Sequence, residues 1–176
     1  MQIAICDEKN EDNEILEDCL KKYFAEKSIT FDIMTFLRNS DLMYEIEDGK
    51  NVAIITDAGM PAISDPGEDL VKQCAEAGVT VCAIPGPCAV ITALSISGLP
   101  TGRFCFEGFL STAKKSRREH LQSLIGETRT MIFYEAPHKL IRTLEDLART
   151  FGEGRRVSLC RELTKLNEEV LRTTLG

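Results

Sequence analysis

The sequence predicts an α/β fold in which a lobe with a parallel sheet precedes a second, shorter α/β lobe. Short apolar segments alternate with helical segments along all 176 residues, which favours parallel strands covered by helices. The segment 52–56 is continuously apolar, as a strand buried on both faces should be. Turns rich in Gly and Pro follow the expected strands. We therefore expect a first lobe at 1–102 and a second at 103–176.

The first lobe takes its elements from apolar periodicity and from helix-boundary residues. In the first expected helix, Ile15, Cys19 and Tyr23 recur at helical spacing. Ser40 is suited to cap the second helix, and glycines end the later ones. The predicted strands are 2–6, 30–36, 52–56 and 79–84, and the predicted helices are 12–27, 40–47, 68–77 and 88–97.

The second lobe follows a linker at 99–102. Its apolar segments are rich in β-branched and aromatic residues, which favours strands. The predicted strands are 103–110, 130–134 and 157–160, and the predicted helices are 113–125 and 137–151.

Composition excludes several classes of protein. The chain has no apolar run long enough to span a membrane and no visible secretory signal. Its seven cysteines are scattered, and none forms a C-x-x-C pair. We therefore expect reduced thiols, a cytoplasmic location and no metal site.

Charge is unevenly distributed along the chain. The net charge is −7 overall, but 14 basic and 10 acidic residues make the segment 103–176 basic. Four cations stand in a run at the start of an expected helix, where they oppose the helix dipole. Phosphate contact explains them, and a solvated helix face is the alternative. The candidate RNA-binding residues are Lys114, Lys115, Arg117 and Arg118.

Two loops after expected strands are candidate ligand sites, because ligands bind at the carboxyl ends of parallel strands. In the loop 57–67, two glycines and two prolines fix the backbone, and Asp57 and Asp65 offer acceptors. The alternative is a long turn whose aspartates cap a helix. The loop 85–89 precedes a helix whose free N–H groups suit a carboxylate, although an ordinary strand-to-helix turn is the alternative.

A third candidate region combines the polar residues after two further strands. His138 is a candidate for proton transfer, although a structural role is the alternative for a lone histidine. Arg161 and Lys165 are suited to hold phosphate or carboxylate, or are simply exposed. The candidate proton acceptors are Glu107, Glu135, His138 and Glu162.

Residues from about 49 to 176 closely resemble the ribosomal small-subunit RNA methyltransferase I family, in the tetrapyrrole-methylase class. The matching stretches are VAIITDAGMPAISDPGEDLV, AIPGPCAVITALSISGLPTGRFCFEGFL, TMIFYEAPHKL and SLCRELTKLNEE. The resemblance implies a two-lobed enzyme that binds S-adenosylmethionine in the cleft between its lobes. It further implies methyl transfer to the 2′-hydroxyl of a cytidine in 16S rRNA, with the small ribosomal subunit as partner. A homodimer is one candidate assembly.

The resemblance also assigns roles to residues. It implies cofactor contacts in both loops and in the second lobe, and RNA at the cationic run. The residues we expect to be catalytic are Glu135, His138 and Glu162. The resemblance implies that the second lobe is truncated at Gly176. Met60, Cys88, Ser111 and Asn167 depart from the family's usual residues. The cofactor-binding residues so implied are Asp57, Ala58, Gly59, Met60, Pro61, Pro85, Gly86, Pro87, Cys88, Ala89, Tyr134 and Arg161.

The first 48 residues instead resemble the start of a response-regulator receiver domain. They show a strand, the acidic pair Asp7 and Glu8, and a helix, while the family's G-T-P-I-G-N loop is absent. The sequence thus predicts a chimera with weak or no methyltransferase activity. The alternative function is a phosphoacceptor module that uses Asp57.

Overall fold

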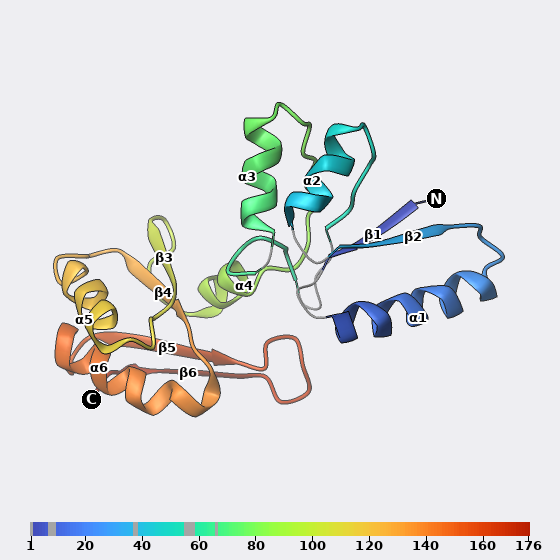
Figure 1. Cartoon of the computed structure of the whole chain (residues 1–176). Coiled ribbons are helices and arrows are strands. Elements are labelled where there is room, and N and C mark those ends of the chain that lie inside the picture. The colour runs from blue at the N-terminus through green and yellow to red at the C-terminus, as the bar shows by residue number, and fades with distance from the viewer. Residues whose placement is uncertain (1, 7–9, 37–38, 55–58, 66) are drawn as a thin grey trace. The chain divides into compact units, whose positions relative to one another are not determined.

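The computed structural model describes residues 2–6, 10–36, 39–54, 59–65 and 67–176 (Figure 1). Side chains are described from residue 14 onward within these ranges, except at 39 and 40. The chain divides into two compact units, Met1–Gly86 and Pro87–Gly176. The residues 87–102, which the sequence placed at the end of the first lobe, are thus part of the second unit. The lobe boundary at 102 stays a prediction.

The first unit contains a two-stranded parallel sheet. Strand β1 (Gln2–Cys6) pairs with β2 (Asp32–Phe36), so that Ile3 lies opposite Ile33. Parallel strands need a crossover connection, and helix α1 (Asn10–Glu26) supplies it. This βαβ unit confirms the parallel sheet predicted for the first lobe.

The core of the first unit lies between two short helices. Leu42, Met43 and Ile46 of α2 (Asn39–Glu47) form a buried cluster with Leu70 and Cys74 of α3 (Glu68–Glu76). The cluster is small, and each fully buried Leu contributes about 2 kcal/mol.

The described residues of two strands predicted for this unit are not in strands. Residues 79–84 form no strand, and Val81 and Ile84 are 50% and 85% exposed. Of the segment 52–56, the described residues 52–54 are not in a strand either. Apolar character alone does not make a strand, because its backbone groups need a neighbouring strand. Among the described residues, β1 and β2 pair with each other and with no third strand.

The second unit contains two pairs of strands. β3 (Phe104–Phe109) and β4 (Thr130–Tyr134) are parallel, with helix α5 (Lys114–Ser123) between them. β5 (Arg156–Arg161) forms an antiparallel hairpin with β6 (Glu169–Thr174), a strand that the sequence did not predict. The expected helix at 137–151 begins as a short 3-10 helix, η1 (Pro137–Lys139), and continues as α6 (Leu140–Phe151).

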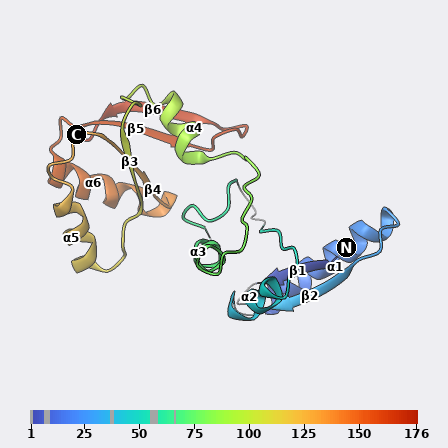
Figure 2. The same cartoon turned by 90° about the horizontal axis from the view of Figure 1, so that it is seen from above.

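Helices cover both faces of these strands. Helix α4 (Ala89–Ile96) lies against the β5–β6 hairpin (Figure 2), where the Cys160 thiol approaches the Ala93 carbonyl and Arg172 donates to the Ile96 carbonyl. Side chains alternate between the faces of a strand. Leu147 of α6 packs with Phe133 of β4 on the other face, beside Leu121 of α5. The second unit is therefore layered, with strands between α4 and the α5–α6 pair.

Candidate functional site

A crevice of about 220 Å³ lies in the second unit along the whole of β4, up to the residue that follows the strand. Ala93 and Ser97 of α4 line one side, and Thr143 of α6 lines another. Tyr134 and Glu135 lie where β4 ends, and Cys160 is contributed by β5. The crevice thus brings together residues from two of the three candidate regions of the sequence.

The carboxylate of Glu135 is held on two sides. Its Oε1 accepts a hydrogen bond from the Ala136 backbone N–H at 2.8 Å, and its Oε2 is 2.5 Å from Oγ1 of Thr143. Because a carboxylate oxygen has two lone pairs, both oxygens remain able to accept a bond from a ligand. Glu135 is thus a fixed acceptor in the wall of the crevice.

Arg117 orients the Thr143 hydroxyl for its contact with Glu135. Its Nε donates to Oδ2 of Asp146 at 2.7 Å, and its Nη2 donates to Oγ1 of Thr143 at 2.8 Å. A guanidinium has no acceptor, so Thr143 accepts from Arg117 and directs its own proton to Glu135. Thr143 is 3% exposed and Arg117 9%, which shields these bonds from water. The hydrogen bonds that link Arg117, Thr143 and Glu135 therefore all donate in one direction, from Arg117 toward Glu135.

Tyr134 adds a hydroxyl close to the start of α4. Burial raises the pKa of the phenol, the Cys88 thiol raises it further, and a hydrogen bond with the Val90 backbone lowers it. Its ring packs at 5.1 Å from Phe106 and 5.4 Å from Phe109, between ring centroids. Tyr134 is thus a neutral hydrogen-bonding group beside Cys88.

The start of α4 has no side-chain cap. Cys88 is extended at the N-cap, and its carbonyl accepts the Thr92 N–H at 3.0 Å and the Thr92 hydroxyl at 2.9 Å. The first N–H groups of the helix attract anionic or acceptor groups. Cys88 is half-buried, whereas Pro87 and Ala89 are exposed.

The remaining loop residues belong to the first unit. Asp57 and Ala58 lie outside the described residues. Gly59 has φ of 89°, and Met60 and Pro61 are half-buried. Pro85 and Gly86 are exposed, and a Cβ added to Gly86 would meet no atom within 4 Å. The backbone of the turn at Gly86 is therefore accessible.

The other candidate proton acceptors lie elsewhere in the second unit. His138 is exposed in η1, and Glu162 is exposed with its Oε1 3.5 Å from Nζ of Lys165. Arg161 is also exposed and forms an ion pair with Glu169. Glu107 is 2.9 Å from Nε2 of His120. None of these lines the 220 Å³ crevice, which contains Glu135 as its carboxylate.

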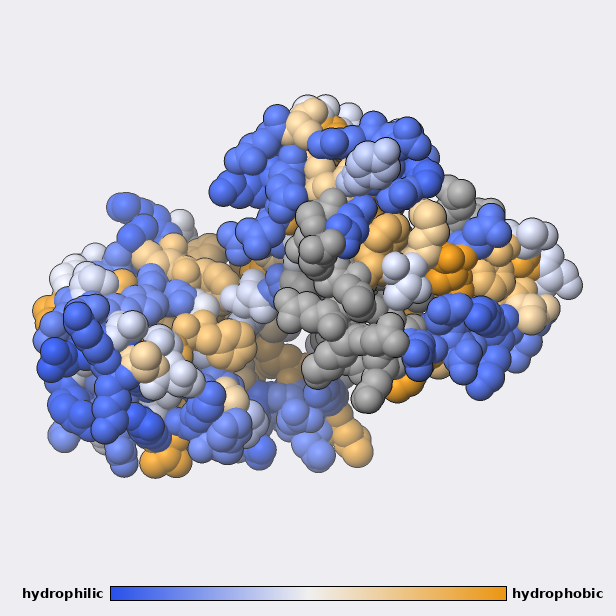
Figure 3. All heavy atoms as spheres, viewed as in Figure 1, coloured by the Kyte–Doolittle hydropathy of each residue, from blue (hydrophilic) through white to orange (hydrophobic). Residues whose placement is uncertain are grey.

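The cationic run divides between surface and interior. Lys114, Lys115 and Arg118 are exposed on α5, in a region where hydrophilic residues predominate (Figure 3). Arg117 points inward to Asp146 and Thr143 instead. Three of the four predicted RNA contacts are therefore available to a polyanion.

Sequence reasoning did not identify Thr143 and Asp146. Both lie on α6, where Leu140, Leu144 and Leu147 recur at helical spacing. Thr143 lies at the edge of this apolar face, which was the one available signal that its hydroxyl is buried.

Neither a cluster of metal ligands nor a membrane-spanning helix is found in the described part of the chain. There, no group of three or more His, Cys, Asp or Glu residues is placed to hold a metal ion. No described helix combines the length and the apolar character that crossing a bilayer requires.

Comparison with known proteins extends this picture. The family model for tetrapyrrole (corrin/porphyrin) methylases matches residues 3–176. Because this match begins at residue 3, it gives no support to a chimeric junction near residue 48, and nothing favours a receiver module.

Curated relatives share about half of the aligned residues. Ribosomal RNA small subunit methyltransferase I of Escherichia coli O157:H7 is 50% identical over 135 residues, which are 77% of this chain and 47% of that protein. The protein of the same name from Synechocystis sp. is 51% identical over 138 residues, 78% of this chain and 50% of that protein. That from Mycobacterium tuberculosis strain CDC 1551 is 48% identical over 145 residues, 82% and 51% respectively. The chain thus spans about half the length of the curated relatives that it matches.

Proposed function

Because the chain belongs to the tetrapyrrole (corrin/porphyrin) methylase family, we propose that it is an S-adenosylmethionine-dependent RNA methyltransferase. The proposed reaction transfers a methyl group to the ribose 2′-hydroxyl of a cytidine in 16S rRNA. The observation that supports it most is the identity of about one residue in two with proteins named ribosomal RNA small subunit methyltransferase I.

The crevice of the second unit suits part of this cofactor. S-adenosylmethionine combines a carboxylate with ammonium and hydroxyl donors and an aromatic base. The crevice has an acceptor in Glu135, a phenol in Tyr134, backbone N–H groups at the start of α4 and apolar walls. When bound, the sulfonium supplies the methyl group. The loop residues 57–61 and 85–87 stay predicted cofactor contacts, as does Arg161.

Glu135 is the proposed acceptor for a hydroxyl proton. It is the candidate that lines the crevice, and its orientation is fixed by Ala136 and Thr143. His138 and Glu162 are exposed and outside the crevice, so the structure favours them less. A positioned base accelerates a proton transfer by about 10²–10⁴-fold.

The exposed cations of α5 are the proposed RNA contacts. Lys114, Lys115 and Arg118 belong to the segment 103–176, which has a net positive charge. Each phosphate contact releases condensed counterions, so RNA affinity should fall steeply as salt rises. A cytoplasmic location and a homodimer stay predictions, and light scattering of the purified chain tests the second.

Calorimetry with S-adenosylmethionine tests the cofactor. Micromolar binding would support the proposal. The same titration of Glu135→Gln, a variant that keeps the size of the side chain, provides the matched comparison. Absence of heat at millimolar cofactor would contradict the assignment.

Methyl transfer tests the substrate separately. Small ribosomal subunits that lack the modification are incubated with the chain and radiolabelled cofactor, and the label is mapped to a nucleotide. Label on a cytidine ribose supports the proposal. Cofactor binding with label on another nucleotide, or on none, would contradict the substrate and leave the cofactor assignment standing.

A further inference from the structure

Helix α5 begins with an unfavourable arrangement of charges. In the described second unit, its N-cap Ala113 offers no side-chain oxygen to the first N–H groups, and its first turn has no acidic residue. Lys114, Lys115 and Arg118 place three exposed positive charges at the end where the helix dipole is also positive. Nζ of Lys115 lies 3.9 Å from Oε1 of Glu119, but both side chains are largely exposed, so this pair contributes little. The first turn is therefore less stable than the rest of α5.

Arg117 holds this first turn to the rest of the unit. Within the described segment 111–119 it has the one buried side chain. Its guanidinium donates to Asp146 and to Thr143, both on α6. A first turn that opened, losing its helical hydrogen bonds, would therefore break the contact that directs the Thr143 hydroxyl to Glu135.

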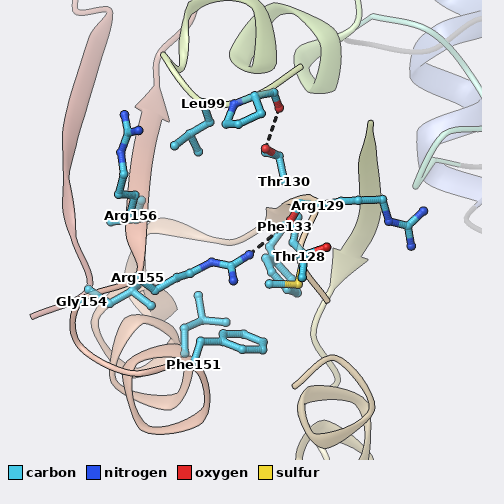
Figure 4. A pocket seen from close by; sticks show the side chains of 14 residues that line it. Leu99, Thr128, Arg129, Thr130, Phe133, Phe151, Gly154, Arg155 and Arg156 are labelled. Atoms are coloured by element: carbon cyan, nitrogen blue, oxygen red, sulfur yellow. Dashed lines mark hydrogen bonds between the residues drawn. The ribbon is translucent and has the colours of Figure 1, made fainter. Parts of the chain in front are cut away.

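Helix α6 is fixed independently of that first turn. Leu147 packs with Leu121, which belongs to the last part of α5. Phe151 faces a cavity of about 350 Å³ that Phe133 of β4 also lines (Figure 4). Thr143 lies about one helical turn before Leu147, so its backbone would stay in place when the first turn of α5 opens. An opening would thus change the direction of the Thr143 hydroxyl rather than the position of α6.

Glu135 would then keep one of its two contacts. The Ala136 backbone N–H still donates to its Oε1, whereas the Thr143 hydroxyl no longer points to its Oε2. The terminal torsion of a Glu side chain has a broad range, so a single bond leaves the carboxylate free to turn. The acceptor in the wall of the crevice is therefore fully oriented only while the first turn of α5 is closed.

We propose that RNA bound at the exposed cations of α5 closes the first turn and thereby orients Glu135, so that Arg117 is a positioning residue whose effect depends on RNA. This inference rests on the proposed function. Phosphate groups would offset the repulsion among the cations and interact favourably with the helix dipole. Because coupling between two sites is reciprocal, a first turn that is already closed would also bind RNA more tightly.

The expected size of the effect follows from the charges. Each cation near a helix N-terminus shifts the equilibrium between the open and the closed turn by about two- to fivefold at low salt. Three such cations together shift it by about tenfold or more, and salt screens the effect. The consequence for catalysis is order: the acceptor for the hydroxyl proton is in place when the RNA hydroxyl is present.

Hydrogen exchange of backbone N–H groups, followed by NMR on the full chain, tests the proposal. The Arg118 N–H reports the first turn, because helix geometry pairs it with the Lys114 carbonyl. The Ala136 N–H reports the Glu135 carboxylate to which it donates. A 16S rRNA fragment should slow exchange at both groups by at least about fivefold at low salt. RNA that leaves either group unchanged would overturn the proposal.

Capping the first turn should reproduce the effect without RNA. Ala113→Asp supplies a capping oxygen and a negative charge, so it should slow exchange at both Arg118 and Ala136 in the RNA-free chain. Gln122→Asp makes the same change of charge at an exposed position in the last turn of α5, and it should slow neither. Equal effects of the two variants, or slower exchange at Arg118 with no change at Ala136, would overturn the proposal.

Variants of Thr143 separate this coupling from direct coverage by RNA. In Thr143→Val, RNA should still slow exchange at Arg118 but no longer at Ala136, because the hydroxyl that joins them is gone. Thr143→Ser keeps the hydroxyl and should keep both effects. Circular dichroism checks that the variants are folded. If RNA still protects Ala136 in a folded Thr143→Val chain, RNA covers that group directly and the proposal is wrong.

Methyl transfer gives a further readout that a merely structural role would not move. Arg117→Lys should lower kcat by about tenfold or more, whereas the KM for RNA should change by less than about twofold because the exposed cations remain. Arg149→Lys alters an exposed partner of the same Asp146 and should change neither. A rise in KM alone would contradict the positioning role. The Ala113→Asp comparison uses neither RNA nor cofactor, so its failure is distinct from failure of the proposed methyltransferase function.

Discussion

Nη2 of Arg117 donates a hydrogen bond to Oγ1 of Thr143 at 2.8 Å, and the Thr143 hydroxyl in turn donates a hydrogen bond to Glu135. Because of this contact, Arg117 is buried, whereas the other cations of the same run are exposed. It also links α5 and α6 to the residue that follows β4. The wall of the crevice is therefore part of the packing of the second unit.

Replacing Arg117 by Met should destabilise the chain by about 3 kcal/mol, because Asp146 would keep a partly buried charge without its main partner. Urea unfolding followed by circular dichroism measures this. Arg118→Met removes a neighbouring exposed cation and should change stability by less than about 0.5 kcal/mol. Equal effects of the two variants would contradict the buried role of Arg117.

Thr143→Val should cost about 1–3 kcal/mol, since Arg117 and Glu135 each lose one buried hydrogen-bond partner. Thr143→Ser keeps the hydroxyl and should recover most of that loss. In a double-mutant cycle, Arg117→Met and Thr143→Val should couple by at least about 0.5 kcal/mol. Additive effects would show that the two side chains do not interact.

Neutralising exposed cations of α5 should weaken RNA binding without unfolding the chain. For Lys115→Ala with Arg118→Ala, the slope of log affinity against log salt should fall by about 1–2, because two phosphate contacts are lost. Filter binding to a 16S rRNA fragment at several salt concentrations measures this slope. An unchanged slope would place the RNA-binding surface elsewhere.

The sequence was sufficient for elements whose pattern is local. The residues Thr130–Tyr134 are β-branched, aromatic and apolar, and they form β4 over the predicted bounds. The α/β class was predicted correctly from the alternation of strand and helix segments, and β1 forms a parallel pair with β2. Strand β6 was missed because Glu169–Thr174 is mostly polar and exposed. It is a strand because it pairs with β5 in a hairpin, not because of its own pattern.

Features that depend on distant partners were not predictable. Residues 79–84 have a strand-like pattern, yet in the described structure they have no strand beside them. Arg117 resembles its neighbours in the sequence, and its burial depends on Asp146, 29 residues away. The hydrogen bond from Thr143 that orients Glu135 joins two elements of the structure, so the sequence did not reveal it.

Glu127 should make the chain sensitive to acid. Hydrogen bonds from the Arg129 side chain, and then from its backbone, hold the pKa of Glu127 at about 2, below the ordinary 4.5. A lowered pKa in the folded state stabilises it above pH 4.5, and this contribution is lost as pH falls toward 2.

Comparison with Glu127→Gln isolates that contribution. The difference in unfolding free energy between the native chain and the variant should be constant above pH 5 and shrink below about 4.5. Urea unfolding at a series of pH values measures it. A difference that stays constant down to pH 2 would contradict the role of Arg129.

Tyr134 should titrate above its ordinary pKa of 10.0, because burial disfavours the phenolate. The ultraviolet absorbance of phenolate, recorded for the native chain and for Tyr134→Phe, gives its titration by difference among the three tyrosines. A raised pKa in the folded state stabilises it fully below the unfolded value, and this contribution is lost as pH rises through the folded value. Stability of the native chain should therefore fall above pH 10 more steeply than that of Tyr134→Phe. A difference titration centred at or below 10.0 would show that the phenol is in water rather than beside Cys88 and Val90.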